Sequence, residues 1–565
     1  MAAPFSHDSS AALVVDGKVV AAAEEERFTR KKHDGNFPVH SVNFCLKQAG
    51  LTPSDIDYIA FPWSIDILRE RKWEYFFKTV RTRFSPAFKK LYRNQKELQD
   101  KVSFIHQTLE ACGFDISSVK VKWVEHQLAH VASSYYLSGM KDAAVMSIDA
   151  GGEITSTLLG QTQKGNIQKI KEIVSADSLG AFYATMTDYL GFDRGEGEYK
   201  VMGMAPFGDS KKVNFDQIIW WDEKKKTFRT NEKYVWVTRD KRFKVDKMYS
   251  KQMVDEFGPE RAGDALSDPY IHIAAATQKK LEEIAVNLVE TYLKESLTRH
   301  GNLCFAGGCA LNVSLNRILL DLPYVKKLWV QPAAHDTGTS LGAAVYVAHQ
   351  MGESIAPMDN AYLGPEFSNH EIENELKQWP FAYTLEKDIC RTACDLLDQK
   401  HVIGWFQGKM EWGPRALGNR SILGNPTVKG TADKINAIIK FREQWRPFCP
   451  SILREHANEI LNSSHDAPYM TIAFKVNDVW KEKIPEVVHI DGTARPQLVD
   501  QKSNPRYYQL IQNFYEKTGI PVLINTSLNR RGEPMICSPK DALKMFEGCG
   551  LDYMVMGDYL VRKEK

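Results

Sequence analysis

Short apolar runs alternate with longer amphipathic stretches through residues 11–350. The segment 11–28, AALVVDGKVVAAAEEERF, predicts two strands joined by an Asp-Gly turn, because this dipeptide favours tight hairpin loops. Residues 271–300 carry apolar side chains at three- and four-residue spacing and predict a long helix. Further strands are predicted at residues 56–61, 119–126, 143–149, 302–308 and 326–333. Strands that alternate with helices in this way predict an α/β domain.

Two segments interrupt the alternation. Residues 66–101 hold eleven Lys or Arg against five Asp or Glu, interleaved with aromatic residues. Basic and aromatic residues together are typical of nucleic-acid surfaces, but we favour a helical insertion with a solvated basic face. Residues 205–250 are polar, include a run of three lysines and predict a surface excursion. Both segments are expected to be insertions in the first domain.

A domain boundary is expected near residues 350–372, where Gly, Pro and Asn occur without periodicity. The chain has 565 residues, which allows two to four domains at about 150 residues each. We therefore predict one domain over residues 1–355 and another over residues 370–565. The second begins with a predicted helix at 371–379 and a predicted strand at 401–408.

Charge and composition narrow the class of protein. Lys and Arg number 73 and Asp and Glu 71, so the net charge of +2 provides no bulk attraction to nucleic acid or to a membrane. No apolar run approaches the about 18 residues of a membrane span, and the first cation, Lys18, comes late for a signal peptide. Nine scattered cysteines without a Cys-x-x-Cys pair indicate reduced thiols. We therefore expect a cytoplasmic protein that binds neither membrane nor nucleic acid.

Two histidines and two aspartates form a candidate metal site. His126 and His130 stand four residues apart in a helix-like stretch, which places both imidazoles on one face. Asp149 and Asp336 each follow an apolar strand, and the carboxyl ends of strands in an α/β sheet border the crevice where ligands bind. Two nitrogen and two oxygen donors suit a first-row ion such as iron, manganese or zinc. The alternative is that the two histidines share a helix face incidentally.

Three glycine-rich turns form a candidate nucleotide site. Residues 149–152, 195–203 and 305–312 each join an apolar stretch to an expected helix, where backbone N–H groups can approach a phosphate. Together they resemble the phosphate and adenosine loops of the actin, hexokinase and Hsp70 type of ATPase. His7, at the mouth of the first hairpin, is a candidate proton acceptor, although a polar turn is an equal interpretation.

The second domain is rich in arginines beside Gly, Pro and apolar residues, with few carboxylates nearby. This pattern favours an anion-binding site over a solvated face, because arginine forks match phosphate and carboxylate groups. The candidate residues are Arg415, Arg420, Ser421, Lys440, Arg442, Arg446, Arg495, Asn525, Thr526, Ser527, Arg530 and Arg531.

Nine motifs in a fixed order extend this interpretation over nearly the whole chain. They are HDSSAALV, EEERFTRKKHD, EHQLAHVASSYY, SIDAGGE, GEGEYKVMGMAPFG, FAGGCALN, HDTGTSLGAA, GKMEWGPRALGNRSIL and WRPFCPSIL. With them the chain resembles the O-carbamoyltransferases of the nodulation and cephamycin type. The chain departs from that family at its start, since only MAAPFS precedes the histidine motif where an apolar first strand is usual; that strand is expected to be short or cut away.

The resemblance implies a fold and a reaction. The first domain would be an ASKHA-fold (actin- and Hsp70-like) domain and the second a YrdC-like α/β domain. The second domain would use carbamoyl phosphate and ATP, with Mg²⁺, to form carbamoyl-adenylate. The first would transfer the carbamoyl group, at a metal that is iron(II) in the family, to a hydroxyl of a small natural product. The acceptor alcohol, the metal and the oligomeric state stay open, a homodimer included.

The resemblance also assigns residues. His126, His130, Asp149 and Asp336 match metal ligands, and His7 matches the base at the acceptor hydroxyl. Gly151, Gly152, Gly307, Gly308 and Asn312 match the nucleotide loops. Arg415, Lys440, Arg446, Arg495, Thr526 and Ser527 match the pocket for carbamoyl phosphate and the adenylate. Lys200 lies in a family motif without an assigned role.

Two other functions compete with this one. Synthesis of threonylcarbamoyl-adenosine on tRNA predicts nucleic-acid binding, which the net charge of +2 does not favour. A sugar kinase or ATPase of the ASKHA type predicts ADP as the product and magnesium as the sole metal.

Overall fold

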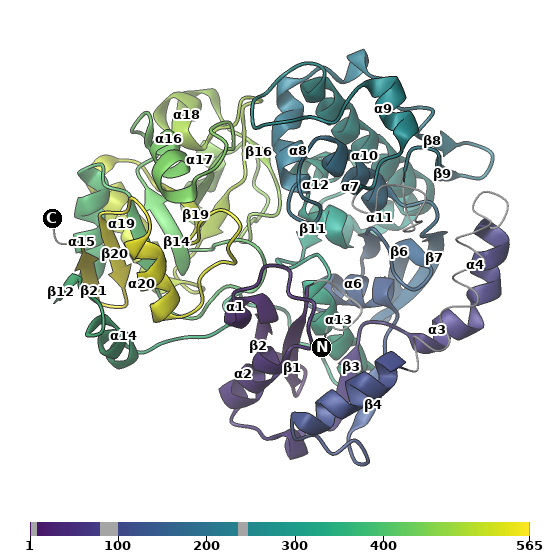
Figure 1. Ribbon diagram of the computed structural model, residues 1–565, viewed down its shortest axis with the longest axis horizontal. Coiled ribbons are helices and arrows are strands. Elements are labelled where there is room, and N and C mark those ends of the chain that lie inside the picture. The colour runs from purple at the N-terminus through teal and green to yellow at the C-terminus, as the bar shows by residue number, and fades with distance from the viewer. Residues whose placement is uncertain (2–7, 80–99, 236–246, 564–565) are drawn as a thin grey trace. The chain divides into compact units, whose positions relative to one another are not determined.

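A computed structural model of the chain describes residues 1, 8–79, 100–235 and 247–563. Its contacts divide the chain into two units (Figure 1). Unit 1 comprises Met1–Val20 and Gly35–Met358, and unit 2 comprises Ala21–Asp34 and Asp359–Lys565. Both mix helices with sheets, as the α/β prediction requires. The predicted first domain, 1–355, thus loses a short stretch to unit 2, where the backbone N–H of Ala22 donates to the carbonyl of Leu363.

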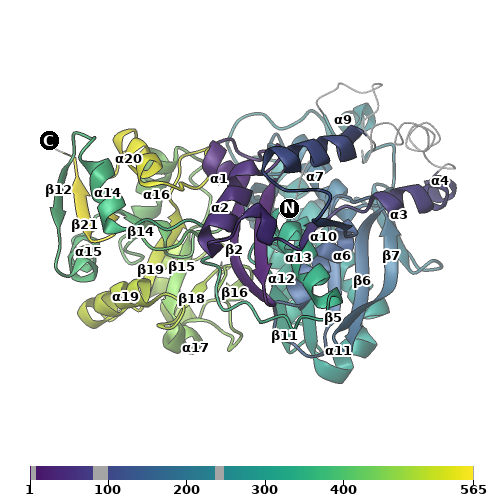
Figure 2. The same ribbon diagram turned by 90° about the horizontal axis from the view of Figure 1, so that it is seen from below.

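A five-stranded sheet, in the order β11-β10-β5-β6-β7, forms the centre of unit 1. The strand β6 (Thr155–Gln163) pairs antiparallel with both β5 (Ala144–Ile148) and β7 (Asn166–Val174). The strand β10 (Asn302–Ala306) pairs in parallel with both β5 and β11 (Lys327–Val330). Every residue of β5 is buried, so a strand of continuous apolar character lies inside the sheet. Figure 2 shows β6 and β7 side by side at one edge.

Two smaller pairs of strands confirm further predictions. The hairpin of β1 (Ser10–Val15) and β2 (Lys18–Glu24) turns at Asp16 and Gly17, both with positive φ (50° and 72°), as a tight Asp-Gly turn requires. The strand β3 (Tyr58–Phe61) pairs in parallel with β4 (Lys120–Trp123).

Helices cover the sheets of unit 1. The helix α6 (His126–Tyr135) packs closely on α13 (Thr337–Gln350), since a Cβ on Gly342 would stand 1.9 Å from the carbonyl oxygen of Ala129. The helix predicted at 271–300 is two helices, broken at Leu293. They are α10 (Tyr270–Tyr292) and α11 (Lys294–His300). The other α-helices of the described part of this unit are α2 (Val39–Ala49), α3 (Ile65–Glu70), α4 (Lys72–Thr79), α7 (Leu179–Tyr189), α8 (Glu198–Met204), α9 (Lys251–Phe257) and α12 (Val313–Leu320), and a helical stretch at 100–111.

The two predicted insertions are only partly described. The segment 66–101 begins with the helices α3 and α4, as expected, and its residues 80–99 lie outside the described part. The segment 205–250 contains a hairpin of β8 (Ile219–Asp222) and β9 (Thr227–Thr230) with the lysine run in its turn. Because Ile219 and Phe228 are fully buried, this hairpin contributes to the core as well as to the surface; residues 236–246 are not described.

Unit 2 is built on an eight-stranded mixed sheet, in the order β12-β21-β20-β13-β14-β19-β15-β18. Its pairs are antiparallel except β13 with β20 and β15 with β18. The strands are β12 (Ala382–Leu385), β13 (Ile403–Phe406), β14 (Arg420–Gly424), β15 (Cys449–Leu453), β18 (Gln497–Val499), β19 (Val522–Ser527), β20 (Tyr553–Met556) and β21 (Tyr559–Arg562).

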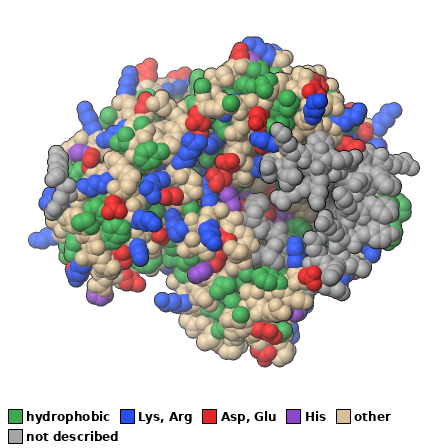
Figure 3. Space-filling model, in the orientation of Figure 1, with side chains coloured by type: hydrophobic (Ala, Val, Ile, Leu, Met, Phe, Trp, Pro, Cys, Tyr) green, Lys and Arg blue, Asp and Glu red, His purple; other side chains and the backbone are tan. Residues whose placement is uncertain are grey.

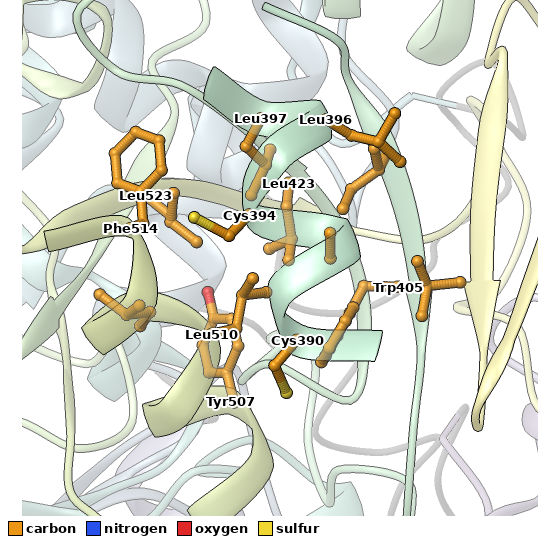
Figure 4. Packing of buried hydrophobic residues seen from close by; sticks show 14 of the residues in the cluster. Cys390, Cys394, Leu396, Leu397, Trp405, Leu423, Tyr507, Leu510, Phe514 and Leu523 are labelled. Carbon is orange, nitrogen blue, oxygen red and sulfur yellow. The ribbon is translucent and has the colours of Figure 1, made fainter. Parts of the chain in front are cut away.

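The main core of unit 2 lies between this sheet and two helices that pack on each other, α15 (Ile389–Asp398) and α19 (Pro505–Thr518). Figure 4 shows Trp405 and Leu423 of the sheet beside side chains of both helices. The remaining elements include α1 (Glu25–Thr29), α14 (Asn369–Leu376), α16 (Thr431–Ile435), α17 (Ala457–Ile460), α18 (Asp478–Lys483), α20 (Pro539–Glu547) and the pair β16 (Phe474–Lys475) and β17 (Thr493–Ala494). The helix predicted at 371–379 and the strand at 401–408 correspond to α14 and β13.

The surface and the cysteines agree with the composition. On the face shown in Figure 3, acidic and basic side chains are interspersed and form no stripe of one sign. None of the nine cysteines, all within the described residues, forms a disulfide bond. Among the described helices, none has the length and hydropathy of a membrane span.

Candidate active site

Four of the predicted metal ligands converge in unit 1. His126 and His130 come from the first two turns of α6, Asp149 directly follows β5, and Asp336 precedes the first residue of α13. One ligand atom of each lies within 4.8 Å of all the others. The Nε2 atom of His126 lies 3.6 Å from Oδ2 of Asp149 and 3.4 Å from Oδ1 of Asp336. The Nε2 atom of His130 lies 3.5 Å from the same oxygen of Asp336.

The histidine rings are rigidly placed by their surroundings. Both are buried, with 2% and 0% of the surface of His126 and His130 exposed. The Nδ1 atom of His126 lies 3.2 Å from the carbonyl oxygen of Pro62. If Nδ1 carries the proton and donates it to this carbonyl, the Nε2 lone pair faces the carboxylates, as in metal-binding histidines. The indole of Trp63 packs against the same ring at 5.4 Å between centroids.

Sequence reasoning about ligands missed Glu153, which holds the start of α6. Its buried carboxylate accepts the backbone N–H of His126 at 3.1 Å and 3.2 Å, and also that of Ser64. Burial raises the pKa of Glu153, and these N–H donors oppose the shift. Glu153 closes the SIDAGGE motif, so its place next to the glycine turn was the available signal. The carboxylate thus ties the first metal-ligand candidate to the loop of residues 62–64.

Two glycine turns hold Asp149. The backbone N–H of Gly308 donates to Oδ1 at 2.9 Å, and that of Gly151 donates to Oδ2 at 3.4 Å. A Cβ on Gly308 would lie 2.9 Å from this Oδ1, so the close approach requires glycine. The turn 305–312 leads through a 3₁₀ turn into α12, as expected of a nucleotide loop.

The turn 149–152 departs from prediction. It leads to the strand β6 and not to a helix, so it has no helix N-terminus with which to attract a phosphate. The reason is the sequence TSTLLGQTQ that follows, which is rich in threonine and pairs antiparallel with β5. Beside it, a Cβ on Gly152 would lie 3.2 Å from Cβ of His126, so this glycine allows the histidine helix to approach.

Asn312 is engaged by neighbouring side chains. Its amide exchanges two hydrogen bonds with that of Gln278, at 2.8 Å and 3.1 Å, and its oxygen accepts the N–H of Leu315 at the start of α12. The hydroxyl of Tyr183 also donates to Gln278. These contacts place Asn312 between α10 and α12. Of the other predicted glycines, Gly151 donates its N–H to Asp149, and Gly307 lies against the backbone of Ile148, the residue before Asp149.

The charge balance of the four-residue cluster favours a cation. Burial lowers the pKa of His126, but the carboxylates of Asp336 and Asp149 outweigh it and raise this pKa well above its ordinary value. For Asp149, burial and the nearby Asp336 raise the pKa. The two histidines lower it by more, so the net pKa is below its ordinary value. Both shifts favour a protonated His126 beside an ionised Asp149 while no metal is bound. The donor set of two imidazoles and two carboxylates, with Nδ1 of His126 anchored, fits a first-row divalent ion.

Gly307 shapes the same region through its backbone. It has a φ of 90°, and a Cβ there would stand 2.4 Å from the carbonyl oxygen of Ile148. His7, the predicted proton acceptor, lies outside the described residues.

A second polar cluster lies in unit 2, at the end of β19. The ammonium of Lys440 donates to the carbonyl and hydroxyl oxygens of Ser527 at 2.7 Å and 3.1 Å. It also donates to the carbonyl and side-chain oxygens of Asn529 at 3.0 Å and 2.6 Å. Burial lowers the pKa of Lys440 well below its ordinary value, and the charges of Arg442, Arg446 and Lys32 lower it further. Asn529 was not among the predicted residues.

Lys440 ends a short π-helical turn, Asn436–Lys440, and Phe441 after it has a φ of 50°. A bulky residue in the left-handed region is uncommon, and π-turns often mark functional sites. The sequence IIKFREQWRPF gave no sign of this turn, because its apolar spacing fits an α-helix equally well.

The other predicted anion ligands are placed around this cluster or used elsewhere. Arg495 donates from Nε and Nη2 to the sulfur of Cys449, at 3.0 Å and 2.8 Å, and Cys449 pairs across the sheet with Asn525. Thr526 follows Asn525 on β19. Arg446 lies 3.5 Å from a carboxylate oxygen of the buried Glu443.

Arg415 is half-buried in the turn that precedes β14. The turn is held from within by Glu411, whose Oε1 accepts the backbone N–H groups of Leu417, Asn419 and Arg420 at 2.8 Å to 3.0 Å.

The prediction that Arg420 binds an anion is wrong. Arg420 is fully buried, its guanidinium stacks on Phe406 at 3.8 Å, and it donates to the carbonyl oxygens of Pro365, Gln407 and Gly408. Both Nη groups of Arg420 thus donate to backbone carbonyl oxygens, so this buried side chain supports the fold and is not placed to bind an anion. The hydroxyl of Ser421 similarly accepts the N–H of Gly418. Two further candidates face carboxylates: Arg530 lies 2.6 Å from Glu533 and Arg531 lies 3.6 Å from Glu443.

Two family models match most of the chain. Residues 2–345 match the family model described as Carbamoyltransferase N-terminus, and residues 394–563 match Carbamoyltransferase C-terminus. An uncharacterized protein of Synechocystis is 36% identical over 99% of this chain and 95% of its own length. Nodulation protein NolNO of Sinorhizobium fredii is 34% identical over 99% of this chain and 79% of its own length. A structure of MreB5 of Spiroplasma citri bound to ADP covers 44% of this chain and 64% of its own, at 13% identity and a TM-score of 0.23, which is too low to support a conclusion.

Proposed function

Because the chain belongs to the carbamoyltransferase family, we propose that it transfers a carbamoyl group from carbamoyl phosphate, with ATP, to a hydroxyl of a small natural product. The observation that carries this proposal is the convergence of His126, His130, Asp149 and Asp336 in the unit that matches the N-terminal family model. We also propose an ASKHA-like fold for unit 1 and a YrdC-like fold for unit 2.

The first half-reaction is assigned to unit 2. Water and carbamoyl phosphate give carbamate and phosphate, and a carbamate oxygen then attacks the α-phosphorus of ATP. The new O–P bond replaces the bond to pyrophosphate, which leaves, and carbamoyl-adenylate results. Lys440, Arg415, Arg446 and Arg495 would bind the anionic groups, with Thr526 and Ser527 donating hydroxyl hydrogen bonds. This activation is needed because nitrogen donates into the carbamoyl carbonyl and makes it a poor electrophile.

The second half-reaction is assigned to unit 1. The acceptor hydroxyl attacks the carbamoyl carbon, its proton passes to His7, and AMP leaves with the electron pair of the broken C–O bond. Gly151, Gly152, Gly307, Gly308 and Asn312 would hold the nucleotide part. His126, His130, Asp149 and Asp336 would hold a divalent ion, iron(II) by the family resemblance. When bound, this ion supplies a Lewis acid that polarises a carbonyl or phosphoryl oxygen.

The burial of the four-residue cluster supports this assignment. A reactive adenylate is lost to hydrolysis in bulk water, so a transfer site has to exclude water. The buried imidazoles of His126 and His130 and the packed indole of Trp63 provide such surroundings.

The test of the proposal needs no acceptor. The protein is incubated with ATP, magnesium and iron(II), with and without carbamoyl phosphate, and pyrophosphate and AMP are followed. Release that requires carbamoyl phosphate is the expected result. ADP formed without that requirement would point to a kinase or ATPase, and pyrophosphate driven by threonine and bicarbonate would point to threonylcarbamoyl-adenosine synthesis.

A further inference from the structure

The stretch Ala21–Asp34 belongs to unit 2 although about 325 residues separate it from the rest of that unit. It contains the second half of β2 and the helix α1. The EEERF motif within it has no role in the reaction proposed above. Its charged side chains Glu24 and Arg27 are almost completely buried, with exposed fractions of 4% and 5%. These buried charges need an explanation, because removing a charge from water is costly unless it is paired.

Glu24 and Arg27 are paired with each other. Nε and Nη2 of Arg27 donate to the two carboxylate oxygens of Glu24, at 2.9 Å and 3.2 Å. Glu26 provides a second carboxylate to Arg27, 2.8 Å from Nη1.

The pair also binds both backbone polar groups of Gly413, in the turn that carries Arg415. Oε1 of Glu24 accepts the backbone N–H of Gly413 at 3.0 Å, and Nη2 of Arg27 donates to the carbonyl oxygen of Gly413 at 3.0 Å. Gly413 has a φ of 104°, a conformation that favours glycine. Both polar groups of one buried glycine are therefore held by one buried ion pair.

Arg415 lies between two fixed points. Gly413 is held by Glu24 and Arg27 on one side, and Leu417 is held by Glu411 on the other, at 2.8 Å. Between them Pro414 restricts the backbone further. The four residues from Gly413 to Ala416 consequently have little freedom, and the side chain of Arg415 leaves the backbone in a fixed direction.

Other contacts fix the position of α1, which carries Arg27. The ring of Phe28 packs on a buried group formed by Met410, Ala416, Met535 and Cys537. The guanidinium of Arg30 donates to the carbonyl oxygens of Met535 and Pro534, at 2.7 Å and 2.8 Å. Phe28 thus touches the same turn through Ala416, whereas Arg30 binds a different loop.

We infer that Glu24 and Arg27 are positioning residues for Arg415, which they hold in the orientation that binds the phosphate of carbamoyl phosphate. The inference rests on the proposed function of unit 2 for the identity of the anion. A prearranged guanidinium binds an anion more tightly, because less conformational freedom is lost on binding. Glu24 and Arg27 make no contact with substrate in this assignment and act only through the Gly413 turn.

A double-mutant cycle on the full-length protein tests the inference. Affinity for inorganic phosphate and for carbamoyl phosphate is measured by calorimetry for Glu24→Gln, Arg415→Ala and the double variant. We expect Glu24→Gln to weaken binding about tenfold, Arg415→Ala to weaken it about a hundredfold, and the double variant to match Arg415→Ala alone. Losses that simply multiply would overturn the inference, because Glu24 would then act independently of Arg415.

Two further variants separate positioning from folding. Arg30→Gln breaks contacts of the same helix with the loop at 534–535 and should change phosphate affinity less than twofold. Glu24→Gln/Arg27→Gln removes both members of the buried pair together, so it should fold if Glu24→Gln does not. It should show the same dependence on Arg415. Equal loss in Arg30→Gln would also overturn the inference.

The outcome distinguishes the inference from the proposed function. Phosphate binding that obeys the cycle, without pyrophosphate release by the wild-type protein, would uphold the positioning role and reject the proposed half-reaction. A wild-type protein that binds neither anion would overturn both.

Discussion

The imidazoles of His126 and His130 face each other across one turn of α6, with their Nε2 atoms 3.2 Å apart. Two lone pairs at this distance repel, so the arrangement requires a proton or a cation between them. The carboxylates of Asp149 and Asp336 complete the surroundings of that position.

His130→Ala should abolish binding of a divalent metal, since it removes one of two nitrogen donors from a buried site. Metal content after loading with iron(II) or cobalt(II) and desalting checks this, and we expect about one equivalent in the wild type and almost none in the variant. His370→Ala, which changes an exposed histidine on α14, is the matched control and should retain metal. Equal metal content in both variants would argue against the site.

The two half-reactions should be separable by mutation. His130→Ala should abolish carbamoyl transfer and leave pyrophosphate release that depends on carbamoyl phosphate largely intact. Arg415→Ala should stop pyrophosphate release. Initial rates of both activities, measured side by side, check the prediction. Equal loss of both activities in both variants would contradict the assignment of one reaction to each unit.

The metal-free protein should lose stability as pH rises. The pKa of His126 is raised in the folded state, so its contribution to stability is fully present below about pH 6.5 and is lost as pH rises through the folded-state pKa. Metal binding needs the neutral imidazole, so loading the site below the folded-state pKa should release a proton. Unfolding temperature against pH, with and without metal, and proton release on loading are the measurements. An apo protein whose stability rises with pH in this range would refute the charge assignment.

Binding of an anion in unit 2 should raise the pKa of Lys440, so that binding at a pH near this pKa should be accompanied by proton uptake. Burial and three neighbouring cations lower the pKa of Lys440, and a bound phosphate would raise it again. Calorimetry with inorganic phosphate in two buffers of different ionisation enthalpy measures the uptake. Lys440→Arg carries a charge at any working pH, and uptake should disappear in it. Unchanged uptake in Lys440→Arg would assign the proton to another group.

Replacing Arg415 should weaken anion binding, whereas replacing Arg420 should lower the free energy of unfolding. Arg420→Ala leaves several buried carbonyl oxygens without a donor and should cost about 3 kcal/mol of unfolding free energy. Arg415→Ala should weaken anion binding with less than about 1 kcal/mol of destabilisation. Denaturant unfolding of both variants, beside phosphate affinity, makes the comparison. Similar stability losses in the two would contradict the separate roles.

Local patterns were sufficient to predict several strands of the first 350 residues and the metal-ligand candidates. Each strand predicted there is present, and the spacing of His126 and His130 placed them on one helix face. Their meeting with Asp149 and Asp336 could be anticipated because both aspartates follow strands of one sheet. The family resemblance added residue roles that spacing alone left open.

Most of the failures depend on contacts that are distant in sequence, and the turn 149–152, between neighbouring strands, is the exception. Arg420 looked like an anion ligand until Phe406 and the carbonyl oxygens around it were known. The turn 149–152 leads to a strand because β6 pairs with β5. Glu153 and Asn529 are ordinary polar residues until the loops bring them to His126 and Lys440.

The membership of Ala21–Asp34 in unit 2 has a consequence for how the protein is made. Synthesis delivers this stretch first and the remainder of unit 2 only after residue 358, so Glu24, Arg27 and Phe28 emerge long before their partners. A fragment that starts at residue 359 would lack α1, leaving the Gly413 peptide and the apolar group beside Met535 without their cover. Completion of the second unit must therefore wait for the whole chain, and the two halves cannot be exchanged as independent cassettes by a single cut near residue 358.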